Sequence, residues 1–232
     1  MRRVRHSIAR GAIHYLHAGI VRSSADERKS YFQSRPRDWL FLPLSHFFLH
    51  GNPELVQRRF GANDREVFPR VVHGGDTRQQ SVANALAQVD ATTEIVLVHD
   101  AVRPFVTPAQ LDRVIAEART RGAAILGIPA IDTVKEVKRA SLPEDVALIT
   151  ATVPRERIVL AQTPQAFSYP LLRDAFRKAQ QDGVTASDEA ALVERFGHDV
   201  FVVLGSERNF KITRPADMDL ARFYLEQERR TK

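Results

Sequence analysis

An acidic and a basic side chain stand close together where an apolar stretch ends, at Asp100 and Arg103. Arginine presents a rigid, planar fork of donors that suits phosphate, and aspartate suits a hydroxyl group or a metal ion. The stretch before them, residues 94–98 (EIVLV), is short and β-branched, which is typical of a buried strand in an α/β sheet. Because open α/β sheets bind ligands at the carboxyl ends of their strands, this pair predicts phosphate chemistry at that edge.

Five further motifs place a phosphate-directed or hydroxyl-directed side chain just after a predicted strand or at a predicted helix start. They lie at residues 74–81 (GGDTRQQS), 132–135 (DTVK), 163–165 (TPQ), 187–190 (SDEA) and 209–215 (NFKITRP). Each motif has a plain structural alternative when it is taken alone. Gly74 and Gly75 form a generic turn, and Ser187 begins a helix whose first acids are favoured by the helix dipole. Asp100 alone would cap a turn, and Arg103 alone would pair with a surface acid.

Short apolar runs alternate with helical periodicity from residue 71 onward, which predicts an α/β fold with a mostly parallel sheet. Strands are expected at residues 70–73, 94–98, 123–128 and 199–204. Helices are expected at residues 77–89, 107–121, 170–181, 187–196 and 215–228. We expect Asp76 to cap the first helix and Gly122 to end the second. Segment 133–159 instead alternates in β fashion around the turn-like residues 141–145 (SLPED), which predicts a protruding hairpin.

The first 70 residues differ in composition from the rest of the chain. They hold 13 basic and 6 acidic side chains, whereas the remaining 162 residues hold 21 and 22, so the formal charge of +6 originates in this segment. They also hold five of the eight His and six of the thirteen Phe, without clear helical or strand periodicity. We therefore divide the chain into an atypical basic segment, 1–70, and a domain over 71–232 that carries the hairpin at about 133–159.

The composition excludes several classes of protein. The chain has no Cys, which excludes a disulfide scaffold and a thiol nucleophile and fits a cytoplasmic protein. The longest apolar run, residues 39–49, is interrupted by Pro43 and His46 and falls short of the ~20 residues that a membrane helix needs, so no membrane partner is expected. The basic charges of residues 1–70 form neither a helical face nor a stacking platform, which argues against nucleic acid as a partner.

In this order and spacing, the six motifs resemble those of the 2-C-methyl-D-erythritol 4-phosphate cytidylyltransferase family over about residues 71–228. The resemblance implies a Rossmann-like sheet of nucleotidyltransferase type. It also implies a reaction in which a sugar-alcohol phosphate attacks the α-phosphorus of CTP, with Mg²⁺ held largely by the CTP phosphates. The hairpin would be a dimerisation arm, exchanged between the subunits of a homodimer. A phosphate monoester, with a second pKa of about 6, is largely a dianion at neutral pH, so this reaction needs no general base.

The resemblance also assigns roles to single residues. Contacts to CTP fall to Gly75, Asp76, Ser81, Asp100 and Ala101, and contacts to the alditol phosphate fall to Arg103, Thr133, Arg155, Thr163, Ser187 and Lys211. Arg155 would reach the site of the neighbouring subunit, and Arg155 and Lys211 would be the catalytic residues that neutralise phosphate charge. The family commonly has Thr where Ser187 stands, a change that keeps the hydroxyl. No protein ligand to a metal ion is expected.

Residues 1–70 do not contain the family's glycine-rich loop, which has the pattern Ala-Ala-Gly-x-Gly-x-Arg followed by Pro-Lys-Gln. Residues 28–33 (RKSYFQ) resemble only its Lys-Gln element, and only weakly. A wrong reading frame, a leader segment and a divergent N-terminal half are three explanations. Loss of one oxyanion-type donor costs ~10²- to 10³-fold in rate, so a chain without the loop is expected to turn over poorly. It is also expected to lack the central strand of the sheet and to be poorly soluble or to fold differently there.

Two other functions stay open beside cytidylyl transfer to 2-C-methyl-D-erythritol 4-phosphate. One is the same reaction on another alditol phosphate, such as ribitol 5-phosphate. The other is a catalytically dead remnant that dimerises through its arm but does not bind CTP.

Overall fold

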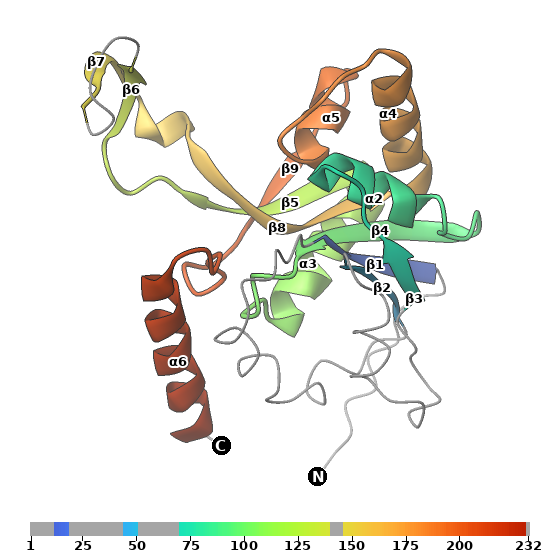
Figure 1. Cartoon of the computed structure of the whole chain (residues 1–232), viewed down its shortest axis with the longest axis horizontal. Coiled ribbons are helices and arrows are strands. Elements are labelled where there is room, and N and C mark those ends of the chain that lie inside the picture. The colour runs from blue at the N-terminus through green and yellow to red at the C-terminus, as the bar shows by residue number, and fades with distance from the viewer. Residues whose placement is uncertain (1–11, 19–43, 51–69, 140–145, 231–232) are drawn as a thin grey trace.

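A seven-stranded sheet runs through the computed structural model, which describes residues 12–18, 44–50, 70–139 and 146–230 of this 232-residue chain (Figure 1). The strands follow the order β3-β2-β1-β4-β8-β5-β9 across the sheet. They are β1 (Ala12–Ala18), β2 (Leu44–His50), β3 (Arg70–His73), β4 (Thr93–Asp100), β5 (Ala123–Pro129), β8 (Val159–Ser168) and β9 (Phe201–Leu204). Neighbouring strands run parallel except at β8, which is antiparallel to β4 and β5. This mostly parallel α/β architecture confirms the predicted fold class.

Helices cover both faces of the sheet, as is usual when parallel strands are buried on both sides. The helices that pack on it are α2 (Arg78–Leu86), α3 (Pro108–Arg121), α4 (Tyr169–Gln181) and α5 (Glu189–Arg195). A further helix, α6 (Pro215–Arg230), follows β9. On one face, α2, α4 and α5 pack with Val96 and Val98 of β4, and on the other α3 packs with Ile95 and Leu97 (Figure 1). No helix in the described ranges is long and apolar enough to cross a membrane.

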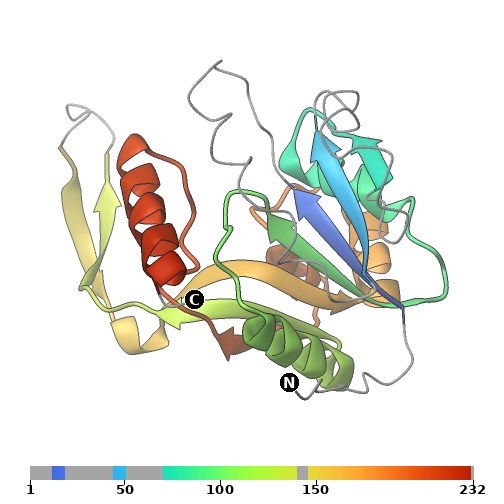
Figure 2. The same ribbon diagram turned by 90° about the horizontal axis from the view of Figure 1, so that it is seen from below.

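The predicted hairpin leaves the main sheet as a separate two-stranded arm, formed by β6 (Val134–Lys138) and β7 (Leu148–Val153). Its strands are antiparallel. The arm stands away from the main sheet in both views, on the side where α6 also lies (Figures 1 and 2). A short 3₁₀ turn, η4 (Arg155–Arg157), leads from the arm back into β8. The predicted turn at residues 141–145 lies outside the described residues.

The first 70 residues supply two strands to the sheet, contrary to the prediction from their composition. β1 lies parallel between β2 and β4, with the backbone of Ala18 opposite Asp100. The expectation of a sheet without a strand at this place is therefore wrong. The physical reason is that β4 is buried, so its backbone N–H and C=O groups need a partner strand on each side whatever the local periodicity. Residues 28–33, which weakly resemble the Lys-Gln element, lie outside the described residues, as does part of the apolar run 39–49.

The sequence pattern missed β8, because its ten residues include Pro164 and show no strict alternation of apolar and polar side chains. Its register against β5 shifts by two residues at Ile125, which leaves Thr163 and Pro164 as a bulge. A bulge bends the strand and redirects a side chain, and bulges are common beside functional sites. At this bulge the hydroxyl of Thr163 accepts a hydrogen bond from the backbone N–H of Asp100, at the end of β4.

Candidate functional site

A pocket of about 170 Å³ opens at the carboxyl end of β4, the edge of the sheet at which the sequence predicted a site. Five predicted residues line it: Asp100, Arg103, Thr163, Ser187 and Lys211. Five further residues complete the lining: Arg78, Ala161, Gln162, Gln165 and Asp188. A larger hollow, of about 410 Å³, lies between α3 and β9 and contains no predicted site residue, so we place the site at the smaller pocket.

The carboxylate of Asp100 is surrounded by three cationic side chains in this pocket. Its Oδ1 lies 3.5 Å from Arg78 Nε, and its Oδ2 lies 3.5 Å from Arg103 Nε and 3.2 Å from Lys211 Nζ. Burial would raise the pKa of the Asp100 carboxyl, but the charges of Lys211, Arg78 and Arg103 outweigh burial and hold that pKa below its ordinary value. Asp100 is therefore a fixed carboxylate at neutral pH. It orders the cations around it and is a poor proton acceptor.

His99 fixes the turn that follows β4 through both of its ring nitrogens. Its Nε2 lies 2.9 Å from the backbone carbonyl of Arg103, and its Nδ1 lies 2.9 Å from the hydroxyl of Thr163. A carbonyl oxygen can only accept, so Nε2 carries the proton and Nδ1 accepts one from Thr163. Burial lowers the pKa of His99 to about 4, which keeps the ring neutral at pH 7. With its proton committed to His99, the Thr163 hydroxyl can offer a ligand only an acceptor.

The glycine turn before α2 lies beside the pocket and is held by its own hydrogen bonds. The backbone N–H of Gly75 donates to Ser81 Oγ at 3.0 Å, and Ser81 Oγ donates to the carbonyl of Thr77 at 2.9 Å. A Cβ at position 75 would overlap the side chain of Gln80, which explains why glycine is needed there. The Ser81 hydroxyl is thus used within the turn, and neither Gly75 nor Ser81 lines the pocket.

The cap of α2 differs from the prediction. Thr77, and not Asp76, is the N-cap residue, and its hydroxyl accepts from the backbone N–H of Gln80 at 3.1 Å. The reason is that a capping box needs Glu or Gln three positions after the cap, and Gln80 satisfies this for Thr77. Asp76 is exposed, and its backbone N–H donates to Gln80 Oε1 at 2.8 Å. The contact with CTP predicted for Asp76 stays a prediction.

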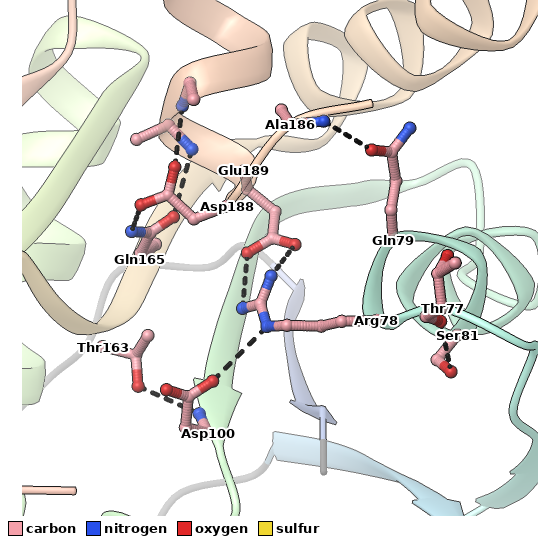
Figure 3. Close-up of polar contacts among 12 residues, drawn as sticks. Thr77, Arg78, Gln79, Ser81, Asp100, Thr163, Gln165, Ala186, Asp188 and Glu189 are labelled. Carbon is pink, nitrogen blue, oxygen red and sulfur yellow. Dashed lines mark hydrogen bonds and ion pairs between the residues drawn. The ribbon is translucent and has the colours of Figure 1, made fainter. Parts of the chain in front are cut away.

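A second helix start, that of α5, faces the pocket (Figure 3). Gln165 of β8 donates through Nε2 to Asp188 Oδ2 at 2.8 Å and accepts from the backbone N–H of Ala190 at 3.1 Å. The other oxygen of Asp188 caps α5 by accepting from Ala191 N–H at 2.9 Å. These contacts fix the backbone next to Ser187, which lines the pocket just before the cap.

Arg78 joins the starts of α2 and α5 (Figure 3). Its two terminal nitrogens donate to the two oxygens of Glu189, at 2.7 and 2.8 Å, while its Nε faces Asp100. The Glu189 side chain is 1% exposed, and burial raises the pKa of its carboxyl although Arg78 acts in the opposite direction. Two parallel charged hydrogen bonds of this kind fix orientation as well as distance.

The remaining predicted residues do not line the pocket of their own chain. Thr133 is exposed just before β6, and Arg155 lies in η4, where its guanidinium donates to the carbonyl of Ile131. The Arg155 side chain is 53% exposed. Ala101 lies in the turn directly after β4. The roles predicted for Thr133, Arg155 and Ala101 toward substrates stay predictions.

Residues 60–227 match the family model described as 2-C-methyl-D-erythritol 4-phosphate cytidylyltransferase, IspD. The chain belongs to this family. It is 57% identical over 159 residues to the 2-C-methyl-D-erythritol 4-phosphate cytidylyltransferase of Acidobacterium capsulatum, and 50% identical over 159 residues to that of Solibacter usitatus. Both matches cover 68% of this chain, and they cover 65% and 64% of the lengths of those relatives.

A solved structure of the cytidylyltransferase family shares the fold. The crystal structure of 2-C-methyl-D-erythritol 4-phosphate cytidylyltransferase from Thermus thermophilus superposes with a TM-score of 0.70 at 31% identity. The superposition covers 94% of this chain and 100% of that one. The structural similarity thus extends in front of residue 60, where the match to the family model begins.

Three residues in or next to the pocket were missed by reasoning from the sequence: Arg78, which lines it, and Glu189 and Asn209, which bond to residues that line it. Arg78 stood inside a recognised motif but was not assigned a role, and Glu189 was interpreted as a plain helix start. The pair is separated by 111 positions, so nothing local signals it. Asn209 was also missed, and it is fully buried. Its side-chain amide donates to the backbone carbonyl of Thr163 at 2.8 Å, and its backbone carbonyl accepts from the Arg103 guanidinium at 2.8 Å. Its place at the start of the recognised motif 209–215 was the signal that could have found it.

Proposed function

We propose that this chain transfers the cytidylyl group of CTP to 2-C-methyl-D-erythritol 4-phosphate, giving CDP-methylerythritol and pyrophosphate for isoprenoid precursor biosynthesis. The observation that carries the proposal is the convergence of Asp100, Arg103, Thr163, Ser187 and Lys211 on one pocket, in a chain that belongs to this family. The relatives described above are named for this reaction, which favours methylerythritol phosphate over ribitol 5-phosphate as the acceptor.

The proposed chemistry relies on alignment and charge. The acceptor's phosphate is largely dianionic at neutral pH and attacks the α-phosphorus without a general base. Lys211 suits the developing charge because its side chain is 45% exposed and its ammonium group lies at the pocket, 3.2 Å from Asp100. Arg103 is more deeply buried, and its guanidinium donates to the Asn209 carbonyl at 2.8 Å, so it offers a fixed cation. Fixed donors of this kind cost no reorganisation when charge moves.

Mg²⁺ is proposed to enter with CTP, bound by the phosphate oxygens. Within the part of the chain that the structure describes, no three His, Cys, Asp or Glu side chains gather closely enough to hold a metal ion. Both oxygens of Asp100 face cationic side chains, which leaves that carboxylate poorly placed to bind a second kind of cation. These residues fit a metal that the nucleotide supplies and whose charge stabilises its phosphates.

A homodimer with exchanged arms is part of the proposal. The arm carries exposed apolar side chains, among them Leu148 and Ile149, which are 61% and 58% exposed in the single chain. Arg155, at the base of this arm, would supply a cation to the neighbouring subunit's pocket. A cytoplasmic location is also proposed, and the absence of Cys supports it.

Release of pyrophosphate from CTP and Mg²⁺ in the presence of each alditol phosphate tests the function. We expect kcat/KM for 2-C-methyl-D-erythritol 4-phosphate to exceed that for ribitol 5-phosphate at least about tenfold, because hydroxyl-directed sites reject wrongly placed hydroxyls. The reverse preference would assign the chain to the other alditol. Absence of heat when millimolar CTP and Mg²⁺ are titrated into the protein would instead support a remnant without nucleotide binding.

A further inference from the structure

The ion pair between Arg78 and Glu189 links the two sides of the proposed site. Arg78 begins α2, directly after the turn assigned to CTP, and Glu189 begins α5, two positions after Ser187 on the alditol side. The same guanidinium faces Asp100 Oδ1 at 3.5 Å, at the strand end between them. One side chain therefore links three elements, its own helix α2 with β4 and α5, which must keep a fixed separation if the two substrates are to meet.

Arg78 differs from Lys211 in its freedom to move. The Arg78 side chain is 28% exposed, and its two hydrogen bonds to Glu189 fix the plane of the guanidinium. Turning toward a ligand would leave the buried carboxylate of Glu189 without its partner, which is strongly unfavourable. Lys211 is more exposed and can turn toward a phosphate at smaller cost. Arg78 is thus suited to hold Glu189 and Asp100 in place, and it is not suited to reorient toward a bound substrate.

We propose that Arg78, held by Glu189, is a positioning residue for the transfer step, an inference that rests on the proposed function. By holding Asp100 Oδ1, it directs Oδ2 toward Arg103 and Lys211 and keeps those two cations aligned. Its effect falls on kcat more than on KM, because the reacting atoms need alignment to within fractions of an ångström while each substrate keeps its own binding contacts.

Two single variants remove this function in different ways. Glu189→Gln removes the charge and keeps the shape, whereas Arg78→Lys keeps the charge and loses the planar fork. Both are expected to lower kcat for pyrophosphate release about 10- to 100-fold and to change KM for either substrate less than about threefold, as loss of alignment predicts. A kcat within about twofold of wild type in both folded variants would overturn the proposal.

Gln79→Ala is the matched control. Gln79 joins the same two regions through neutral groups. It accepts from Ala186 N–H at 3.0 Å (Figure 3) and donates to the carbonyl of Val184 at 3.0 Å. It is expected to leave kcat within about twofold of wild type. An equal loss of kcat in Gln79→Ala would show that breaking any contact between α2 and the α5 region lowers kcat, which contradicts a special role for Arg78.

A double variant separates positioning from stability. Arg78→Met combined with Glu189→Leu replaces the buried pair by apolar side chains, a change that is often neutral or stabilising. We expect a thermal unfolding midpoint close to that of wild type together with the loss of kcat. Recovery of wild-type kcat in this variant would mean that the pair serves only the fold.

Hydrogen exchange distinguishes failure of this inference from failure of the proposed function. In Glu189→Gln, the backbone N–H groups of Asp100 and Ala190 are expected to exchange at least about tenfold faster than in wild type, because their surroundings open more often. Gln79→Ala should leave both rates unchanged. If the wild-type chain releases no pyrophosphate, the proposed function fails and these rates alone decide: unchanged exchange in Glu189→Gln overturns the positioning role.

Discussion

The two parts of this chain, before and after about residue 60, differ in how they resemble the cytidylyltransferase family. Residues 60–227 match the family in sequence, and the pocket lies within them. The preceding residues lie outside that match, yet β1 pairs with β4 in the sheet and β2 pairs with β1. A strand in a sheet supplies mainly backbone hydrogen bonds, which many sequences can make, whereas a reaction site needs particular side chains. Fold and chemistry are therefore separable in this chain.

The largest expected effect comes from exchanging the first part. In a chimera, residues 1–59 are replaced by an N-terminal segment that carries the triphosphate loop implied by the resemblance, Ala-Ala-Gly-x-Gly-x-Arg followed by Pro-Lys-Gln. We expect kcat/KM for pyrophosphate release to rise by ~10²- to 10³-fold over the wild-type chain, the usual value of one preorganised donor at a developing charge. The same chimera with Lys211→Ala is the control and should lose the gain. A chimera no faster than wild type would place the defect outside the first part.

A second prediction concerns the arm. Arg155→Ala and Lys211→Ala chains are each expected to be nearly inactive, because each removes a cation from every site. Mixed in equal amounts and allowed to exchange subunits, they should recover about a quarter of wild-type activity, since half of the dimers would then have one intact site under two-fold symmetry. Activity of the mixture equal to the mean of the two variants alone would contradict arm exchange.

The smallest effect concerns the stability of the second part, through His99. The pKa of His99 is about 4 in the folded chain and about 6.5 when unfolded, so the unfolded state binds the proton first as the pH falls. The unfolding free energy should be at its full value above pH 6.5 and fall by up to about 3 kcal/mol toward pH 4. Denaturant unfolding across this range measures it.

His99→Gln should remove most of that pH dependence, while the same change at the exposed His198 should leave it in place. Asp100 has a lowered pKa and affects stability only at more acidic pH. The raised pKa of Glu189 gives a change of opposite sign within the same range as His99, so the comparison of His99→Gln with wild type isolates the His99 contribution. An equal loss of stability from pH 6.5 to pH 4 in His99→Gln would contradict the neutral, doubly bonded ring.

The sequence predicted those features that depend on local pattern. The stretch 94–98 alternates its apolar side chains between two covered faces, as its buried position in β4 requires, and Gly122 ends α3 with a positive φ of 91°. Local pattern failed where distant partners decide the structure. β1 forms because β4 needs a neighbour, and β8 forms across a bulge at Thr163. The contact between Arg78 and Glu189 depends on a fold that joins positions 111 apart, which no spacing rule contains.

The most direct test of the central claim is pyrophosphate release by the full wild-type chain, with CTP and Mg²⁺, as 2-C-methyl-D-erythritol 4-phosphate is added. We expect release that depends on the alditol phosphate and that Lys211→Ala lowers by about 10²-fold, because the exposed cation of the pocket stabilises the transferring phosphate. A rate of pyrophosphate release that does not depend on the alditol phosphate, or that is unchanged in the folded Lys211→Ala variant, would contradict the assignment of this pocket as the site of cytidylyl transfer.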